Sequence, residues 1–310
     1  AGELRLSAPA LGGTRWGAHG AISGQHGSEP YRVSGPPGSG DADDLRAFGY
    51  RRIGVRGGPA YTLSSLSSVV ADLRVEAIAA AVPIAPTRRL PDGRVTAIDL
   101  GLRRGDSRVV SVGLGYTRDN RPDPALPHQG TRVEVVGELG TSLLGGSYDF
   151  AVLLGRYDRF WPLTHKSALG LRLAGGTVIG DAPRFDRIHI GDVDRMLAPR
   201  VMGMTTALTA PLDLLGTDNA DTVYGEVGGS VTVEYVYQWW RRPHRIYGGD
   251  LFVAAGVWTL ATTDELRLRD RRAFAALPVD LMLDVGLRID TEIGVFEFAL
   301  ANALGRVPRW

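Results

Sequence analysis

The chain has 310 residues, of which 44% are hydrophobic and 22% are charged, and its formal net charge is only +1. This near-neutral balance gives no electrostatic reason to expect a nucleic-acid partner, and the absence of cysteine excludes a disulfide framework or a thiolate metal site. No stretch approaches the roughly 18 consecutive apolar residues of a transmembrane helix. The first ten residues lack the features of a signal peptide, so we expect any targeting segment to lie outside this sequence.

Taken in chain order, the sequence predicts a succession of β-strands, because apolar residues recur at alternate positions in one segment after another. Glycine is abundant, with 41 residues, which suits tight turns and closely approaching strands better than helices. Two connections are long: Gly24–Asp44, rich in Gly, Pro and Ser and predicted to be an exposed loop, and Asp181–Arg200. The candidate strands are 2–8, 14–23, 48–57, 66–80, 95–104, 108–118, 131–139, 146–157, 166–177, 203–212, 222–238, 248–260, 279–290 and 293–304.

These segments have one apolar face and one polar face. Between Val223 and Tyr237 the odd positions are mostly apolar, whereas the even positions include Thr232 and Glu234. Several segments run ten residues or more, which suits the roughly 9–11 residues of a strand tilted across a bilayer better than the roughly 5–6 of a soluble sandwich strand. We therefore predict an all-β fold, a transmembrane antiparallel β-barrel of about 14–16 strands with a hydrated lumen; a soluble β-sandwich is the alternative. The charges expected on the lumenal face, as a channel lining or as ordinary filling, are Arg172, Glu226, Asp284 and Arg288.

Aromatic residues gather near the ends of the predicted strands. Tyr157 precedes Trp161 by four residues, and Tyr235 and Tyr237 precede a pair of tryptophans. Amphipathic rings at strand ends are typical of the girdles that sit at the headgroup level of membrane barrels, although a soluble aromatic cluster would show the same composition. The expected girdle residues are Trp161, Trp239, Trp240 and Trp310.

The stretch Gly113–Val135, GLGYTRDNRPDPALPHQGTRVEV, begins and ends with strand-like alternation around a polar connection that contains three prolines. Asp119 and Asn120 can hydrogen-bond their own backbone, the prolines prevent continued pairing, and Gly130 frees the chain to turn into the next strand. The stretch therefore predicts a hairpin. The order Thr117, Arg118, Asp119, Asn120, Pro127 and Gly130 resembles the strand-turn-strand signature of the Omp85 superfamily, the outer-membrane assembly and secretion barrels.

The resemblance extends over about residues 95–304 and is thin before Phe48. It implies one barrel domain over 1–310 in a bacterial-type outer membrane, with a long loop near 178–202 that folds into the barrel. It also implies periplasmic N-terminal domains, which are not present in this sequence. The family has sixteen strands, and here Pro308 argues against a final paired strand, so whether that strand is missing stays open.

In the family, the inward loop carries a Gly-Gly and then an Arg-Gly-aromatic motif, and its arginine meets acids of neighbouring strands. By position Arg195 corresponds to that arginine, although Met and Leu replace the Gly-aromatic pair, and the second expected acid falls near Ala254. An arginine inside a barrel needs a partner, because an uncompensated buried charge is costly. The alternative is that Arg195 is a solvated loop residue. The candidate lock comprises Gly191, Asp192, Asp194, Arg195 and Glu234.

No catalytic arrangement is found. The six histidines share no metal-ligand spacing, and neither a Gly-x-Ser-x-Gly elbow nor a phosphate-binding loop is present. Asp213, Asp218 and Asp221 could attract a cation, but a solvated turn is the better explanation. We expect no enzyme activity, no cofactor and no bound metal.

The resemblance implies an assembly barrel that inserts outer-membrane proteins. A weakly paired seam between the segments 2–8 and 293–304 would offer free backbone groups to a client strand. The expected partners are the lipid bilayer, unfolded outer-membrane protein clients and accessory lipoproteins. Two alternatives stay open: a passive channel or porin whose lumenal charges set selectivity, and a polypeptide secretion transporter of the same superfamily.

Overall fold

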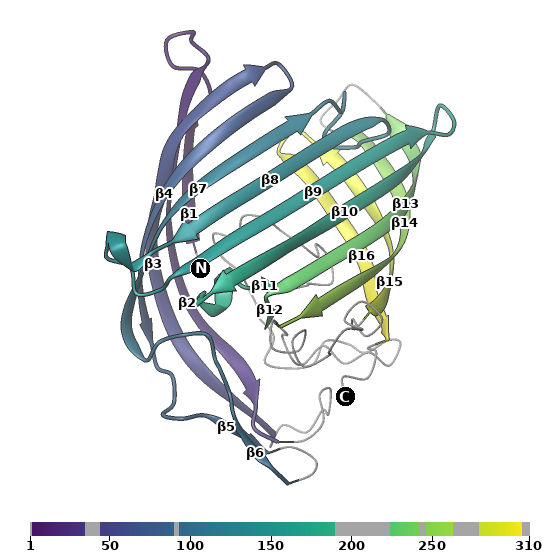
Figure 1. Ribbon diagram of the computed structural model, residues 1–310. Helices are drawn as coiled ribbons and strands as arrows, with labels where there is room; N and C mark the ends of the chain where they lie inside the picture. Colours follow the sequence, from purple (N-terminus) through teal and green to yellow (C-terminus); the bar gives the residue numbers. More distant parts are fainter. Residues whose placement is uncertain are drawn as a thin grey trace, which may run out of the picture.

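The alternation of apolar and polar residues produces one long antiparallel sheet. The computed structural model describes residues 2–34, 44–89, 93–189, 224–241, 246–262 and 279–305. Twelve strands of this described part form a sheet that curls around an interior (Figure 1). In sheet order they are β1 (Gly2–Ala8), β2 (Trp16–Arg32), β3 (Leu45–Ser64), β4 (Ser67–Ala80), β7 (Gly105–Asp119), β8 (Gly130–Gly140), β9 (Phe150–Pro162), β10 (Ser167–Gly180), β13 (Val227–Arg241), β14 (Ile246–Ala261), β15 (Val279–Thr291) and β16 (Gly294–Gly305).

Within the described ranges, six short elements lie outside the main sheet. Four of them are strands that pair in two separate two-stranded sheets, and two are 3-10 turns. Among the described residues no helix has the length and apolar character needed to cross a membrane. The all-β class predicted from the sequence is confirmed. The short elements are β5 (Thr87–Arg89), β6 (Val95–Ala97), β11 (Ile188–His189), β12 (Tyr224–Gly225), η2 (Ser142–Leu144) and η3 (Arg184–Asp186).

Consecutive strands are joined alternately at two ends of the sheet. At one end, called here the turn end, only Ser65 and Leu66 separate β3 from β4, and only Glu292 and Ile293 separate β15 from β16. At the opposite end, called the loop end, the chain between β4 and β7 includes β5 and β6, and the chain between β10 and β13 includes η3. The connections at the loop end are therefore long enough to fold into the interior of the barrel.

Each strand divides into an apolar outer face and a polar or aromatic inner face. In β13, Val233 and Tyr235 are 45% and 44% exposed, whereas Thr232 and Glu234, which alternate with them, are 9% and 2% exposed. The exposed side is the one that a membrane barrel turns toward lipid, and the opposite side lines the lumen. The predicted two-environment pattern and the transmembrane β-barrel fold are confirmed.

Two predicted segments are wrong in part. Of 95–104 only Val95–Ala97 is a strand, and it pairs with β5 rather than with the barrel. The alternation that follows comes from a connection that buries Leu100 in the interior and turns at Gly101, where φ is +65°. The predicted loop Gly24–Asp44 is strand as far as Arg32, because β3 pairs with β2 along this whole length and overrides its loop-like composition. The candidate strand 203–212 lies outside the described residues.

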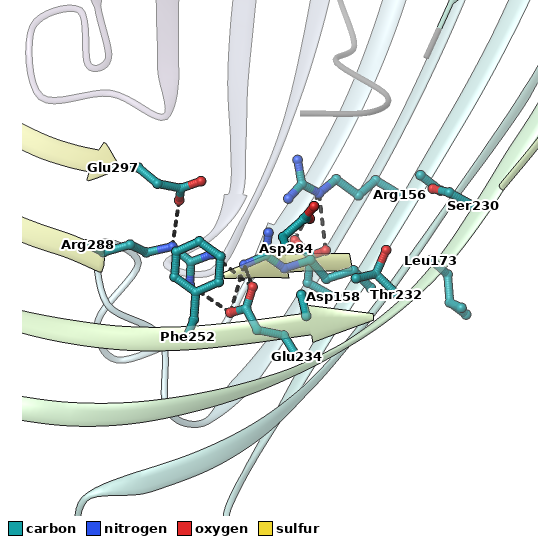
Figure 2. A pocket seen from close by; sticks show the side chains of 13 residues that line it. Arg156, Asp158, Leu173, Ser230, Thr232, Glu234, Phe252, Asp284, Arg288 and Glu297 are labelled. Carbon is teal, nitrogen blue, oxygen red and sulfur yellow. Dashed lines mark hydrogen bonds and ion pairs between the residues drawn. The ribbon is translucent and has the colours of Figure 1, made fainter. Parts of the chain in front are cut away.

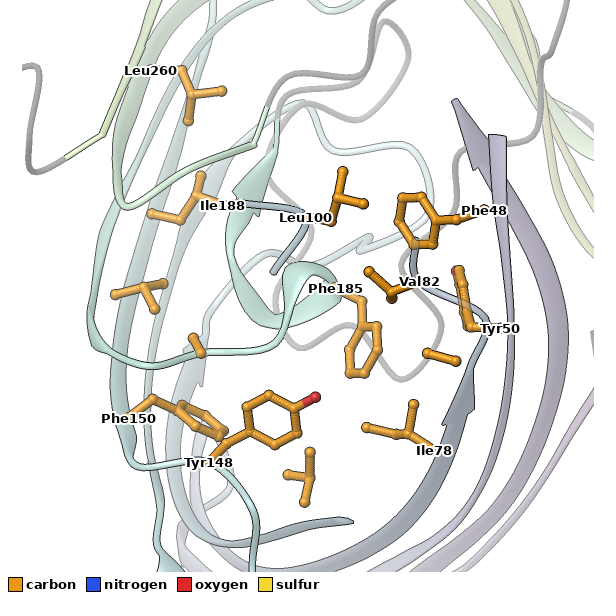
Figure 3. Close-up of a cluster of buried hydrophobic side chains, with 14 residues drawn as sticks. Phe48, Tyr50, Ile78, Val82, Leu100, Tyr148, Phe150, Phe185, Ile188 and Leu260 are labelled. Atoms are coloured by element: carbon orange, nitrogen blue, oxygen red, sulfur yellow. The ribbon is translucent and has the colours of Figure 1, made fainter. Parts of the chain in front are cut away.

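A hydrophobic core occupies the interior near the loop end (Figure 3). Phe48 and Tyr50 of β3 face it from one wall, and Phe150 of β9 faces it from another. Phe185 of η3 lies between these walls and is only 2% exposed. The segment that follows β10 therefore packs inside the barrel, against the inner faces of strands that are distant in sequence.

Candidate functional site

The inner walls of β3, β4 and β8 carry a network of paired charges. Arg52 of β3 donates to both carboxylate oxygens of Glu76 on β4, one of them at 3.1 Å. Arg74 Nη1 lies 2.9 Å from Glu138 Oε1 on β8, and Arg56 Nη2 lies 2.8 Å from Glu138 Oε2. All five side chains are at most 11% exposed. Because buried charges are tolerated only when paired and hydrogen-bonded, these contacts tie β3, β4 and β8 to one another along the inner face of one wall.

The same network holds η3 inside the barrel. Asp186 accepts two hydrogen bonds from Arg74, at 2.9 and 3.0 Å, and the Arg52 guanidinium lies 3.5 Å from the centroid of the Phe185 ring. A bidentate arginine–carboxylate pair and a cation–π contact are both geometrically demanding. The segment from Arg184 to Asp186 is therefore anchored to β3 and β4 by side chains as well as by the surrounding core.

A second contact ties η3 to the connection between β6 and β7. The backbone N–H of Arg184 donates to the carbonyl of Gly101 at 2.7 Å, and Arg187 Nη2 lies 2.6 Å from Asp99 Oδ2. Partial burial alone would raise the pKa of Asp99, but the hydrogen bond and positive charge of Arg187 hold that pKa below its ordinary value. The Asp99 carboxylate is therefore ionised and paired at neutral pH.

A separate network surrounds Glu234 on the opposite wall (Figure 2). Arg288 of β15 donates to both oxygens of Glu234 at 2.7 and 2.8 Å, and Arg172 of β10 lies 3.0 Å from it. Arg288 also lies 2.6 Å from Glu297 of β16 and 3.9 Å from the centroid of the Phe252 ring. These charges line a polar cavity together with Arg156, Asp158, Thr232 and Asp284.

The strand register explains how these side chains meet. Glu234 of β13 is in register with Ala254 of β14. The small side chain of Ala254 leaves space over β14, between β13 and β15. Arg288 reaches across that space from β15. Arg288 also pairs directly with Glu297 in the β15–β16 hairpin. Sequence reasoning missed this partner, although counting outward from the two-residue turn at Glu292–Ile293 would have placed 288 opposite 297.

The predicted hairpin is confirmed as the β7–β8 unit. Asp119 accepts hydrogen bonds from the backbone and the side chain of Arg121, and Asn120 exchanges contacts with the backbone of Thr131. Gly130 has φ of +99°, and a Cβ there would lie 2.8 Å from the Arg121 Cα, so only glycine fits this turn without strain. Of the other signature residues, Arg118 is exposed and Pro127 is buried.

The connection inside this hairpin reaches across the turn end to β13 and β14. His128 Nε2 lies 2.9 Å from Asp250 Oδ2 of β14, and Asp123 Oδ2 lies 2.7 Å from Arg241 Nη2 of β13. Leu126 between them is 1% exposed. Since β8 and β14 are separated by β9, β10 and β13 in the sheet, these contacts bring distant walls together. The interior therefore holds packed segments at both ends.

Three of the four predicted girdle residues lie at the turn end. Trp161 and Trp239 are 39% and 57% exposed, near the last residues of β9 and β13. A register shift between Gln238 and Trp240 places the Trp240 ring over Gly249, where an added Cβ would come within 2.5 Å of the ring. The two neighbouring indoles stand edge to face, with centroids 4.8 Å apart.

Part of the predicted site lies outside the described residues, namely Gly191, Asp192, Asp194, Arg195 and Trp310. The same holds for the acids Asp213, Asp218 and Asp221. Glu234, the acid expected to meet Arg195, is engaged by Arg172 and Arg288. Within the described residues, no cluster of His, Cys, Asp and Glu has metal-binding geometry.

The two ends of the sheet are β1 and β16. β1 pairs with β2 from Gly2↔Gly24 to Ala8↔Ala18, and β16 pairs with β15 from Gly305 back to Gly294. In the described part of the chain each of these strands has one neighbour in the sheet order. Each therefore presents a row of backbone donors and acceptors on its free side.

Comparisons with known proteins agree with this architecture. The sequence model of the Omp85 superfamily domain matches residues 2–308. Over 139 residues the chain is 26% identical to the outer membrane protein assembly factor BamA of Nitratidesulfovibrio vulgaris, an alignment that covers 44% of this chain and 17% of that protein.

Solved structures show the same fold at low sequence identity. The chain is similar to BamA from Haemophilus ducreyi lacking POTRA domains 1–3, with a TM-score of 0.63 and 13% identity, over 98% of this chain and 58% of that one. It is also similar to CdiB from Escherichia coli, with a TM-score of 0.56 and 8% identity, over 94% of this chain and 47% of that one. The chain thus spans 58% or less of the length of these relatives.

Proposed function

Because the chain belongs to the Omp85 superfamily and is a bacterial outer-membrane barrel, we propose that it inserts client proteins into the outer membrane by pairing a client strand with an open end of its sheet. The clients would be unfolded outer-membrane proteins. Accessory lipoproteins would be further partners of the whole protein.

The observation that carries this proposal is the pair of end strands. β1 and β16 each have a single neighbour in the described sheet, so their free sides offer backbone N–H and C=O groups at regular spacing. In a bilayer an unpaired backbone group costs several kcal/mol, so such an edge strongly favours any strand that satisfies it. A client strand that adds to the edge gains main-chain hydrogen bonds without any bond-making chemistry.

The packed interior favours this reading over a passive porin. A porin needs an open water-filled lumen, whereas here Phe185 and Asp186 are held inside by Arg52 and Arg74. A secretion transporter, which the fold likeness to CdiB makes the second candidate, would have to move these segments aside before a polypeptide could pass. Client insertion at the edge leaves the interior contacts in place.

Reconstitution into liposomes tests the proposal. The chain of 310 residues is folded into vesicles, an unfolded outer-membrane protein is added, and its folding is timed. Protein-free vesicles and vesicles that carry the same mass of a passive barrel serve as controls. Folding well above both controls supports the proposal. The barrel itself is shown to be folded by its resistance to unfolding in detergent. If it is folded and the client still folds no faster than in the two controls, insertion by this barrel alone is contradicted.

A further inference from the structure

The outer face of β7 carries two exposed arginines that bracket an apolar stretch. Arg108 and Arg118 both point to the same side of the strand as Val112 and Leu114, which are 43% and 60% exposed. Ten residues of strand extend about 34 Å, and a tilt of about 35–45° reduces this to a height of about 24–28 Å. This height matches the apolar band of about 25 Å in outer-membrane barrels. Arg108 therefore lies at the loop-end boundary of the bilayer, and Arg118 lies at the turn-end boundary.

The two boundaries differ in chemistry. At the turn end the outer wall carries Trp161 and Trp239, and Trp16 of β2 packs at a tilt against Tyr61 of β3 with a centroid distance of 4.8 Å. At the loop end the outer wall of β3 carries Arg51 instead. Arg51 lies two residues from Ile53, on the same face of the strand and closer to the loop end, and Ile53 is 69% exposed. The turn end is therefore an aromatic girdle, and the loop end is basic on this side of the barrel.

Strand register places the loop-end arginines on one patch. Arg51 of β3 pairs with Ala79 of β4, and Ala79 pairs with Asp106 of β7, two residues before Arg108. Two interstrand steps of roughly 9–10 Å and a two-residue offset of roughly 7 Å place the two arginine Cα atoms roughly 12 Å apart, a span that two long arginine side chains can close around one headgroup. Asp106 lies on β7 in register with Arg51, but the exposed Arg104, just before β7, leaves the patch with a net positive charge.

The η2 turn adds an apolar element to the same patch. Ser147 donates its backbone N–H to the carbonyl of Arg108 at 2.7 Å, and Thr141 donates to that of Val110 at 3.0 Å, so the turn is fixed beside Arg108. At its tip Leu143 and Leu144 are 93% and 54% exposed, and the connection between β8 and β9 projects from the wall (Figure 1). Contact with acyl chains is favourable for exposed leucines at a membrane boundary, because it removes their apolar surface from water.

We propose that this patch, made of Arg51, Arg108 and the η2 leucines, is a binding site for phosphate-bearing lipid headgroups at the loop end of the barrel. The planar guanidinium groups match phosphate oxygens in a bidentate manner, while Leu143 and Leu144 enter the acyl region below the headgroup. Arg51 and Arg108 are both exposed, and neither is ion-paired with another described side chain, so both are available to an anionic ligand.

Native mass spectrometry of the detergent-solubilised chain tests this site. The chain is titrated with phosphatidylglycerol and, separately, with zwitterionic phosphatidylcholine. Wild type should bind the anionic lipid preferentially. The double variant R51Q/R108Q should bind it roughly 30-fold more weakly, which corresponds to about 2 kcal/mol at about 1 kcal/mol per arginine.

The matched control is R118Q, which removes the same side chain from the same face of β7 at the opposite end. It should change binding by less than about threefold, because the neighbouring arginine at that end, Arg159, is already held by the Thr131 hydroxyl and by the Trp161 ring. The charge-conserving variant R108K should retain most of the binding, and heat-modifiable migration confirms that each variant is folded. Equal binding by wild type and R51Q/R108Q, or equal losses in R51Q/R108Q and R118Q, would overturn the site.

Discussion

Replacing Glu234 with alanine should destabilise the barrel far more than replacing its neighbour Glu297. Glu234 is 2% exposed and accepts from Arg172 and from both terminal nitrogens of Arg288. Its removal leaves Arg288, which is 6% exposed, without its bidentate partner. Breaking one side of a buried ion pair typically costs about 3–5 kcal/mol, whereas Glu297, one-third exposed at 33%, should cost about 1 kcal/mol or less.

Equilibrium unfolding in urea, followed by tryptophan fluorescence in lipid vesicles, measures this difference. The double variant E234A/R288M should recover much of the loss, because it removes the stranded charge together with its partner. If E234A costs no more than E297A, or if E234A/R288M is less stable than E234A, the network around Glu234 does not brace the barrel.

Four further predictions follow from single contacts. Gly130→Ala should cost about 1–3 kcal/mol in the same unfolding assay, because φ of +99° and the nearby Arg121 backbone strain any Cβ; a change below about 0.5 kcal/mol would show that the turn adapts. Phe185→Ala should raise single-channel conductance by about twofold or more, since that ring fills the interior near the loop end, and unchanged conductance would mean that other groups close the lumen. Because the pKa of Asp99 lies below its ordinary value in the folded protein, its contact with Arg187 contributes stability above the usual carboxyl pKa, and this stability is lost as the pH falls through the folded pKa. The hydrogen-exchange protection factors of segment 98–104, corrected for the intrinsic rate at each pH, should therefore fall in acid, and Arg187→Met should abolish that dependence. A variant that keeps Trp239 as its sole tryptophan should be quenched by lipids brominated near the headgroup more than by lipids brominated deep in the chain, and the reverse order would place this ring away from the interface.

The two-faced strands could be predicted because alternation is a local property. Val233 and Thr232 occupy adjacent positions with opposite character, and no distant residue is needed to decide that a strand separates two environments. The β7–β8 turn was equally accessible, since Gly130, Asn120 and the prolines act on their own backbone. Local chemistry thus specified the wall of the barrel.

The interior could not be predicted in the same way. Arg74 and Asp186 are separated by 112 residues, and nothing in the sequence near either one identifies the other. Leu100 shows alternation like that of a strand residue, yet it packs in the interior, because burial in the core and burial in a sheet leave the same apolar pattern. Gly24–Arg32 shows the converse, since pairing with β3 imposes a strand on a loop-like composition.

Disulfide trapping of a client tests the central claim of edge pairing most directly. The chain contains no cysteine, so Phe298→Cys, 61% exposed on the end strand β16, introduces a single thiol. Leu153→Cys is the matched control, because Leu153 is 54% exposed and lies on β9, a strand that is paired on both sides. During folding in liposomes, a client with one cysteine in its terminal strand should crosslink to residue 298 and not to residue 153. Equal crosslinking at both positions, or none at 298 while folding is accelerated, would contradict insertion through the open end of the sheet.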